Sequence, residues 1–482
     1  MLKTPNGNTI ESLDRVMLLA MWARQLQSES KASGLSQKKI ISAGMGKPSF
    51  PINYHAAKVG LSYWESIYSK AKQAKSLLQQ HNDAGAILNE KIAEIGAVID
   101  YGDPQGELSA REKMAQALRQ WYGEQVNIQS EHILFTVGGA GALHNIFSVL
   151  NRQDPKNLIV TPFPHYSLYV GPHRANHLHP IDVMSLSGYC LTAAALAKSL
   201  EEAHSLAQTQ ETSVSALLLC DPNNPLGTVI PPDELLNIAE VLRLYPKLYI
   251  ILDEAYAEMQ LNGEKYCSLL SLAPDLKQRI ILLRSATKAL SAAGERMGIL
   301  VAFDSALMTQ FIQENINSCG HAPISSQIIF SEAMLQLTNH ELHELISFYK
   351  PQVDYVVKRL KKIGAAMPDP HYTIQGTFYV MADLSALFGL PMSAGMERVF
   401  GEIGRIETDE HLIYYLLFNE GIMVAPLSYF GISPRLGYVR ITCSGGELEL
   451  KELLDRLEDC LLKARSLKEA PLKADECLEI HV

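Results

Sequence analysis

The stretch RSATKALSAAGERMG, residues 284–298, follows the apolar run RIILL and decides how the rest of the chain is interpreted. It places Ser285, Lys288 and Arg296 after a sequence that is typical of a buried strand. A single lysine is most often a solvated surface residue. The sequences that accompany this stretch therefore decide whether its polar side chains form a site.

The middle of the chain repeats a short apolar run, then a polar or glycine-rich turn, then a helical stretch. The runs are HILFTV, NLIV, ALLLC, LYIIL and RIILL. Strands that alternate with helices predict an α/β fold with a mostly parallel sheet and helices on both faces. Continuous apolar runs are typical of strands buried on both sides.

The length of 482 residues is too great for one hydrophobic core, so two or more domains are expected. We predict a large domain that contains a helical insertion at about 53–99, a smaller α+β domain built from the N- and C-terminal segments, and a loosely held tail at 473–482. The predicted segments are an N-terminal segment at 1–60, the large domain at 61–335 and the small domain at 336–482.

The composition excludes several classes of function. The formal net charge of −10 argues against a general nucleic-acid partner or a membrane-surface partner. No apolar run is long enough to span a membrane, and the polar start of the chain is not typical of a signal peptide. The seven cysteines are scattered and never form a CxxC pair, so no metal site is expected and a reduced, cytoplasmic compartment is predicted.

Three further motifs follow predicted strands. The glycines of GGAGAL can bring backbone N–H groups close to an anion, or can simply form a tight turn. DPNNPLG either directs the Asn224 amide at a ligand or forms a loop. In DEAY, Asp253 either caps the next helix or is a buried carboxylate that needs a cationic partner.

Ligands of such sheets bind beyond the carboxyl ends of the strands, where all these motifs lie. One compound matches the groups expected at this edge, which are an anion cradle, an amide, a carboxylate, a phenol and a lysine. It carries a phosphate, a phenolic oxygen, a pyridine nitrogen and an aldehyde. That compound is pyridoxal 5′-phosphate, PLP. The lack of a third glycine in GGAGAL argues against a dinucleotide.

The ordered set GGAGAL, PHYSLY, NNPLG, DEAY, SATK, GERMG and VRITCS resembles the class I/II aminotransferases of fold type I. The resemblance extends from about Gly44 to Gly446 and implies a PLP-binding large domain with a seven-stranded type of sheet. It implies that Lys288 forms an internal aldimine with the cofactor and later acts as general base. Asp253 would hold the pyridinium proton.

The resemblance also implies other cofactor contacts. Tyr256 and Asn224 would hydrogen-bond to the phenolic oxygen, and Tyr166 in the P-x-Y-x-x-Y pattern would stack on the ring. The residues implied for the phosphate are Ser285, Arg296 and the backbone N–H groups of Gly139 and Ala140. Tyr101 would reach the phosphate of a neighbouring subunit, which implies a homodimer.

The implied substrates are an L-amino acid and a 2-oxo acid that react by a ping-pong mechanism. Arg440 would bind the α-carboxylate through two hydrogen bonds, and Gly46 would lie near it. The segment INSCGHAPISSQ has no arginine but contains His321, so a neutral, aromatic or mixed substrate side chain is expected in place of strict aspartate specificity.

Two alternatives stay open at this point. The first is other PLP chemistry on the same fold, such as a C–S lyase, a decarboxylase or a cyclase, because the motifs do not choose the bond that breaks. The second, less favoured, is a non-catalytic PLP-fold regulator. Such a regulator would usually carry a DNA-binding extension, and no such sequence is visible.

Overall fold

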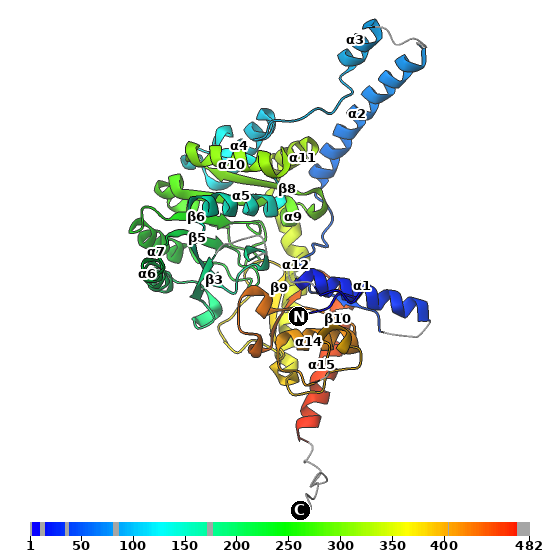
Figure 1. The fold of residues 1–482 in the computed structure, drawn as a ribbon, viewed down its shortest axis with the longest axis vertical. Coiled ribbons are helices and arrows are strands. Elements are labelled where there is room, and N and C mark those ends of the chain that lie inside the picture. Colours follow the sequence, from blue (N-terminus) through cyan, green and yellow to red (C-terminus); the bar gives the residue numbers. More distant parts are fainter. Residues whose placement is uncertain are drawn as a thin grey trace, which may run out of the picture. The chain divides into compact units, whose positions relative to one another are not determined.

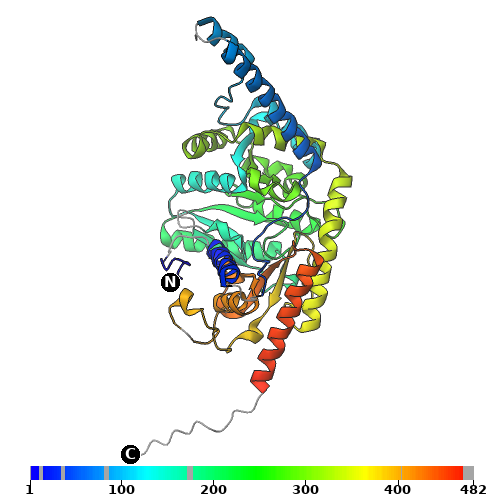
Figure 2. The ribbon, with the colours of Figure 1, turned by 90° about the vertical axis from the view of Figure 1, so that its right-hand side faces the viewer.

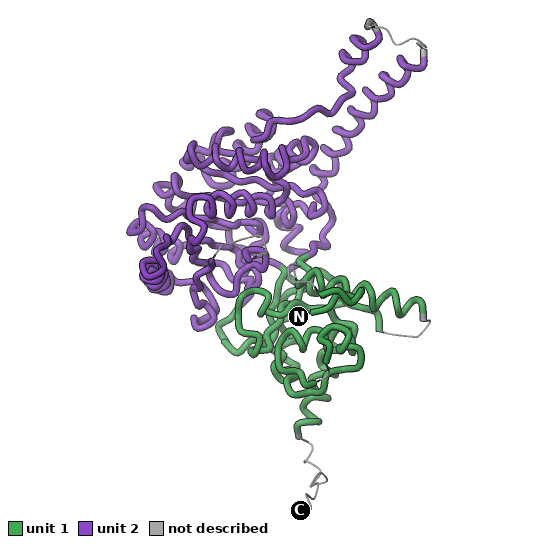
Figure 3. The backbone as a smooth tube through the Cα atoms, viewed as in Figure 1, with its two compact units in different colours: residues 1–46, 350–372, 378–482 green, residues 47–349, 373–377 purple. Residues whose placement is uncertain are grey.

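The computed structural model describes residues 2–9, 15–33, 38–80, 86–170, 177–402 and 404–469, and the predicted tail at 473–482 lies outside them. The chain forms two compact units (Figure 3). Unit 1 contains residues 1–46, 350–372 and 378–482, and unit 2 contains residues 47–349 and 373–377. The sequence analysis places the corresponding boundaries at 60/61 and 335/336.

Unit 2 is built on a seven-stranded sheet with the strand order β2-β8-β7-β6-β5-β3-β4 (Figure 1). Its strands are β2 Ile133–Val137, β3 Leu158–Phe163, β4 His177–Asp182, β5 Val214–Cys220, β6 Tyr249–Asp253, β7 Ile280–Ser285 and β8 Met297–Ala302. Strands β4, β3, β5, β6 and β7 pair in parallel, and β8 pairs antiparallel with both β2 and β7. The mostly parallel α/β sheet predicted from the sequence is confirmed.

Helices of the same unit flank this sheet. They are α4 Leu108–Tyr122, α5 Gly138–Gln153, α6 Ala193–Gln210, α7 Pro232–Arg243, α8 Leu269–Leu272, α9 Ala286–Ala289, α10 Ser305–Cys319 and α11 Ile324–Gln336. Helix α5 packs on β2, β7 and β8, and α6 packs on β3, β4 and β5. All residues of β7 and β8 are buried, as expected for apolar strands covered on both sides.

The predicted helical insertion is a pair of helices, α2 Tyr54–Gln80 and α3 Ala86–Ile95. Helix α3 ends where Gly96 adopts a left-handed φ of 62°, so the helical stretch expected to reach residue 99 ends earlier. Helix α2 packs on α11 and on α3. Figures 1 and 2 both show this α2–α3 hairpin extending away from the helices that flank the sheet.

Unit 1 combines N-terminal and C-terminal segments. Its helices are α1 Arg15–Ser33, the second part of α12 Asn339–Ile363, α13 Glu397–Phe400, α14 Asp409–Tyr415 and α15 Glu447–Glu469, and its strands are β1 Ile41–Ser42, β9 Tyr379–Asp383, β10 Ile422–Met423, β11 Ala425–Pro426 and β12 Tyr438–Thr442. Strand β1 pairs in parallel with β10, which ties the start of the chain to its last third. Strands β11, β12 and β9 form a separate antiparallel sheet.

Among the described helices, none is both long enough and apolar enough to cross a membrane.

Candidate active site

The carboxyl ends of β5, β6 and β7 bring several polar side chains to one edge of the sheet. Cys220 at the end of β5 pairs with Asp253 at the end of β6, and Asp253 pairs with Leu283 near the end of β7. Because neighbouring parallel strands end at the same edge, the turns that follow them lie together. We call the polar residues at this edge the strand-end cluster: Asn224, Asp253, Tyr256, Ser285, Lys288 and Arg296.

Asp253 is a buried carboxylate whose hydrogen-bond donors are neutral. Its Oδ2 accepts a hydrogen bond from the Tyr169 hydroxyl at 2.7 Å, and its Oδ1 accepts one from the Ala255 N–H at 3.3 Å. Burial raises the pKa of Asp253. No lysine, arginine or histidine among the described residues forms an ion pair with it. A ligand whose cationic ring nitrogen donates a hydrogen bond to Asp253 would supply the missing positive charge.

Lys288 lies in α9, the single helical turn after β7. Its Nζ is 5.6 Å from the centre of the Tyr256 ring, and the Asn224 amide nitrogen is 3.5 Å from the Tyr256 hydroxyl oxygen. All three side chains are at most 7% exposed. The Ser285 hydroxyl starts α9 by accepting a hydrogen bond from the Thr287 N–H at 3.2 Å. The amine, the phenol and the amide are therefore held beside the buried carboxylate by three consecutive strand ends.

The antiparallel strand β8 explains how Arg296 reaches the same edge. Met297 pairs with Val137 at the end of β2, and Gly298 pairs with Ser285 at the end of β7. The chain that leaves β7 therefore returns to the same sheet edge before β8 begins. The sequence analysis did not predict β8. A Cβ at Gly298 would lie only 2.4 Å from the carbonyl carbon of Gly138, so the two backbones are in direct contact.

The start of α5 and the Arg296 guanidinium form an anion cradle. Gly138 has a φ of +67°, and a Cβ there would lie 2.8 Å from a guanidinium nitrogen of Arg296. A Cβ at Gly139 would lie 3.7 Å from the Ser285 Cβ, which places that hydroxyl beside the helix start. Backbone N–H groups in a first helical turn lack partners within the helix and attract anions. Together with Ala140, these residues fit a phosphate group.

The PHYSLY motif contributes a residue that the sequence analysis missed. Tyr166, the residue singled out there, is half-buried and meets Tyr169 edge-to-face at 5.6 Å between ring centres. Tyr169 itself is fully buried and donates the hydrogen bond to Asp253. His165 stacks on Tyr169 at 6.0 Å. Tyr169 could have been predicted from the sequence, because it is the second tyrosine of the P-x-Y-x-x-Y pattern.

A buried ionic network lies next to the cluster in sequence and was not predicted. Arg284 is 2% exposed, forms an ion pair with Glu258, and donates a hydrogen bond to the Tyr122 hydroxyl at 2.5 Å. That hydroxyl donates to Glu254 at 2.5 Å. Burial raises the pKa of Glu254. The network ties the turn after β6 and the end of β7 to helix α4, which helps to orient the backbone that carries Asp253 and Lys288.

Tyr101 lies in the turn before α4 and is 92% exposed. Its ring meets the His321 ring edge-to-face at 6.2 Å. Within a single chain the Tyr101 side chain is therefore almost fully accessible to solvent.

The remaining predicted residues lie in unit 1. Arg440 on β12 is 4% exposed, donates a hydrogen bond to the Gly44 carbonyl at 2.8 Å, and stacks over Tyr379 at 4.2 Å and Phe430 at 4.7 Å. Gly46 follows Gly44 in the same unit. The two aromatic rings fix the plane of the guanidinium, which is the condition for two-point recognition of a carboxylate.

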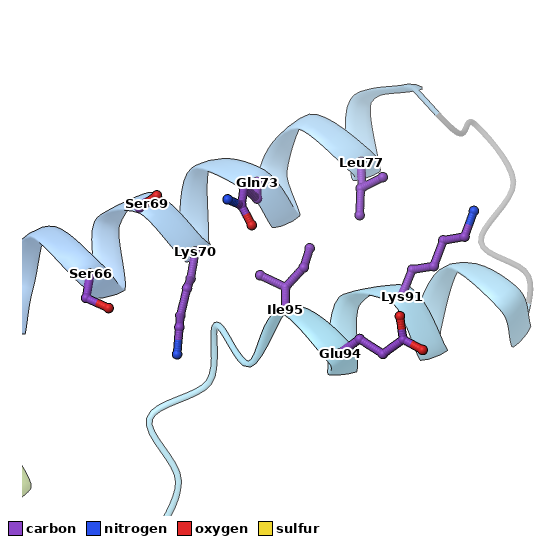
Figure 4. A pocket seen from close by; sticks show the side chains of 8 residues that line it. All are labelled: Ser66, Ser69, Lys70, Gln73, Leu77, Lys91, Glu94 and Ile95. Atoms are coloured by element: carbon purple, nitrogen blue, oxygen red, sulfur yellow. The ribbon is translucent and has the colours of Figure 1, made fainter.

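A groove of about 810 Å³ lies elsewhere in unit 2, between the two helices of the α2–α3 hairpin (Figure 4). It is lined by Ser66, Ser69, Lys70, Gln73, Leu77, Lys91, Glu94 and Ile95. None of these residues belongs to the strand-end cluster, and the groove is open to solvent.

The chain has the mixed-sheet α/β fold of the fold type I, PLP-dependent superfamily. The chain belongs to the family described as "Aminotransferase class I and II", which residues 58–457 match. The chain is therefore an aminotransferase, and enzymes of this family depend on PLP in general.

Curated relatives and solved structures carry related names. The chain is 25% identical over 376 residues to a "Probable aspartate/prephenate aminotransferase" of Rickettsia felis, covering 77% of this chain and 85% of that protein. It is 24% identical to a "Kynurenine--oxoglutarate transaminase" of Dictyostelium discoideum, covering 76% and 85%. The structure of the aspartate aminotransferase from Rhizobium meliloti superposes with a TM-score of 0.70 at 20% identity, covering 94% of this chain and 96% of that one. That similarity supports the fold.

Proposed function

We propose that this aminotransferase binds PLP at the strand-end cluster and uses Lys288 as its catalytic lysine. The observation that carries the proposal is the convergence of a buried carboxylate, a phenol, an amide and a buried amine at one sheet edge, next to an anion cradle. These groups complement every polar atom of PLP. Neither a structural lysine nor a helix cap accounts for all of them together.

The role proposed for each side chain follows from its surroundings. Asp253, which accepts a hydrogen bond from the Tyr169 hydroxyl, accepts another from the protonated ring nitrogen and keeps that nitrogen charged. Tyr256 and Asn224 hydrogen-bond to the phenolic oxygen, and Tyr166 packs against the ring. The phosphate binds to the Ser285 hydroxyl, to the Arg296 guanidinium and to the backbone N–H groups of Gly139 and Ala140.

The bound cofactor supplies an electron sink for the negative charge that develops on the substrate Cα. Lys288 Nζ removes the proton from that carbon as the general base. Burial in a site that excludes water keeps the amine poised for this transfer. Arg440 and Gly46 bind the α-carboxylate and so set the orientation of the Cα–H bond. An L-amino acid and a 2-oxo acid then react in turn, which gives ping-pong kinetics.

For the substrate side chain we propose a neutral, aromatic or mixed specificity. The segment 316–327 contains no arginine that could bind a second carboxylate. Both ring nitrogens of His321 already contact backbone groups, Gly102 N–H at 3.1 Å and Ala322 carbonyl at 2.8 Å. The names of the relatives include both aspartate and kynurenine activities, which is compatible with a broad range.

We propose a homodimer in which Tyr101 reaches the phosphate of the neighbouring subunit. The 92% exposure of Tyr101 in the single chain supports this role, because it leaves the phenol accessible to a neighbouring subunit. A reduced, cytoplasmic compartment remains our prediction from the scattered cysteines.

The reaction is tested by giving the purified, PLP-loaded protein one amino acid with no 2-oxo acid present. We expect one equivalent of 2-oxo acid per subunit for each active amino acid in a panel, with loss of the yellow colour. Release of ammonia or CO₂ in its place would favour the lyase or decarboxylase alternative. A fully active monomer by light scattering would contradict the proposed role of Tyr101.

The carboxylate site is tested by Arg440→Lys. A lysine supplies a point charge without the two-point fork, so kcat/KM should fall by about two orders of magnitude for all amino acids alike. A change for some amino acids only would show that Arg440 binds the side chain instead.

A further inference from the structure

The turn that carries Tyr101 is held by the connection between α10 and α11. Gly102 donates its backbone N–H to Nε2 of His321 at 3.1 Å. The other ring nitrogen, Nδ1, lies 2.8 Å from the Ala322 carbonyl oxygen. A carbonyl oxygen can only accept, so Nδ1 carries the proton and Nε2 is the acceptor. Both nitrogens of a neutral imidazole are therefore used to join the turn to the connection.

A second set of hydrogen bonds fixes the same turn. Glu107 accepts a hydrogen bond from the Asp103 N–H at 3.0 Å, and its own N–H donates to the Gln327 side-chain oxygen at 2.7 Å. Gln327 is fully buried and donates to the Ala322 carbonyl at 2.8 Å. The Ala322 carbonyl thus accepts from both His321 and Gln327.

The same connection also supports the anion cradle. Ser326 in the first turn of α11 donates a hydrogen bond to the Glu295 carbonyl at 3.0 Å, directly before Arg296. Residues 321–327 therefore hold the backbone at two residues that bind a phosphate in the proposed function. Arg296 binds the phosphate in its own subunit, and Tyr101 binds the phosphate in the neighbouring subunit.

We infer that His321 is a positioning residue that fixes the Gly102 turn so that the Tyr101 phenol projects toward the phosphate bound by a second copy of this chain. The inference rests on the proposed function. It assigns His321 a structural acceptor role in place of a contact with the substrate. Tyr101 is 92% exposed and its ring meets the His321 ring edge-to-face at 6.2 Å, so its direction depends on His321 and on the backbone that His321 holds.

Two substitutions separate this role from a general loss of packing. In His321→Gln, the amide oxygen reaches the position of Nε2 and can accept from Gly102. In His321→Asn, the shorter amide can still donate to the Ala322 carbonyl but leaves the Gly102 N–H without its acceptor. The two variants therefore differ in the hydrogen bond from the Gly102 N–H to residue 321, which is the bond that the inference requires.

The first measurement is hydrogen–deuterium exchange of the full-length, cofactor-free protein over residues 98–107. We expect His321→Asn to speed exchange of this segment about tenfold and His321→Gln to leave it within about twofold of the wild type, since one hydrogen bond contributes up to about a tenfold change in an equilibrium. Equal, unchanged exchange in both variants would overturn the inference.

The second measurement is PLP affinity, titrated by absorbance into the cofactor-free dimer. His321→Asn should weaken binding by about three- to tenfold, and His321→Gln should restore it. The same comparison in a Tyr101→Phe background should show no further effect of His321→Asn, because the phenol through which His321 acts is then absent. An equal loss in both backgrounds would overturn the inference.

The two proposals fail in distinguishable ways. A wild-type protein that binds no PLP would overturn the proposed function, and with it the cofactor part of this inference, whatever the exchange data show. A wild type that binds PLP normally, with His321→Asn indistinguishable from it, would overturn the role of His321 and leave the proposed function standing.

Discussion

The strand-end cluster and the α2–α3 hairpin belong to the same compact unit and differ in how their polar groups are held. Asp253 and Lys288 are 4% and 7% exposed; Asp253 accepts a hydrogen bond from Tyr169, and Lys288 Nζ lies 5.6 Å from the centre of the Tyr256 ring. On the hairpin, Trp64 and Tyr68 of α2 are 53% and 70% exposed. The hairpin encloses a groove of about 810 Å³, yet Lys91 and Glu94 in that groove are exposed to solvent. The comparison teaches that withdrawal of charged groups from water, more than the size of a groove, marks the site of chemistry.

The largest effect should come from Lys288→Ala. Removal of the amine eliminates both the covalent bond to the cofactor and the general base, so kcat should fall at least about 10⁴-fold. Borohydride reduction followed by peptide mass analysis should locate PLP on the SATK peptide of the wild type and nowhere in the variant. Lys91→Ala on the hairpin is the control and should keep the label on Lys288. Full turnover in Lys288→Ala would refute the assignment.

A smaller loss is expected for Asp253→Asn. The amide can still accept from Tyr169 but cannot stabilise a protonated ring nitrogen, so kcat should fall by about 10²- to 10³-fold while the thermal unfolding temperature stays close to that of the wild type. Asp182→Asn is the matched control, because Asp182 ends β4 in the same sheet but is exposed. Near-normal kcat in Asp253→Asn would remove this residue from the mechanism.

The buried carboxylate of Asp221 should make stability depend on pH. Burial raises its pKa to about 8, so the folded protein retains a proton that the unfolded chain releases from about pH 4 upward. The free energy of unfolding therefore falls as pH rises through this window.

Asp221→Asn should remove that contribution, because the amide oxygen can still accept from the Ile230 N–H. The measurement is the free energy of unfolding in urea, taken for both cofactor-free proteins at pH 5 and at pH 7. From pH 5 to pH 7 this free energy should fall by about 2 kcal/mol more in the wild type than in the variant. Exposed Asp233→Asn controls for loss of a charge. A parallel pH dependence in wild type and Asp221→Asn would refute the expectation.

The smallest effect is expected in the hairpin. Replacing Lys70 and Lys91 with alanine removes solvated charges that line the groove, so kcat/KM should stay within about twofold and stability within about 0.5 kcal/mol. A tenfold loss of kcat/KM would show that the comparison between the two regions is wrong and that the groove takes part in function.

Much of the fold was predictable because its information is local. The apolar runs and the motifs that follow them each lie within a few residues, and the parallel sheet follows from their alternation. Strand β8 was missed because its apolar residues continue directly from GERMG without a separate turn signal. Its antiparallel pairing depends on partners elsewhere in the chain.

The candidate site was predictable in its motifs and not in its supporting contacts. The hydrogen bonds from Tyr169 to Asp253 and from Arg284 to Tyr122 join positions far apart in sequence. No pattern in one sequence links such positions, since the fold alone brings them together. His321 was noticed only as part of a segment without arginine, and its two backbone contacts in the fold suggest the positioning role.

The antiparallel strand β8 also bears on the order in which the chain folds. Ser285 and Gly298 pair across a short loop, whereas Met297 pairs with Val137 from a much earlier part of the chain. Closing a short loop costs less chain entropy, so the β7–β8 pair should form before β2 joins it. In a folding intermediate at that stage, Lys288 would lie on a closed loop, and the glycines at the start of α5 would not yet have reached the sheet edge. We expect such an intermediate to retain PLP poorly, so that firm retention of the cofactor reports on the late docking of β2.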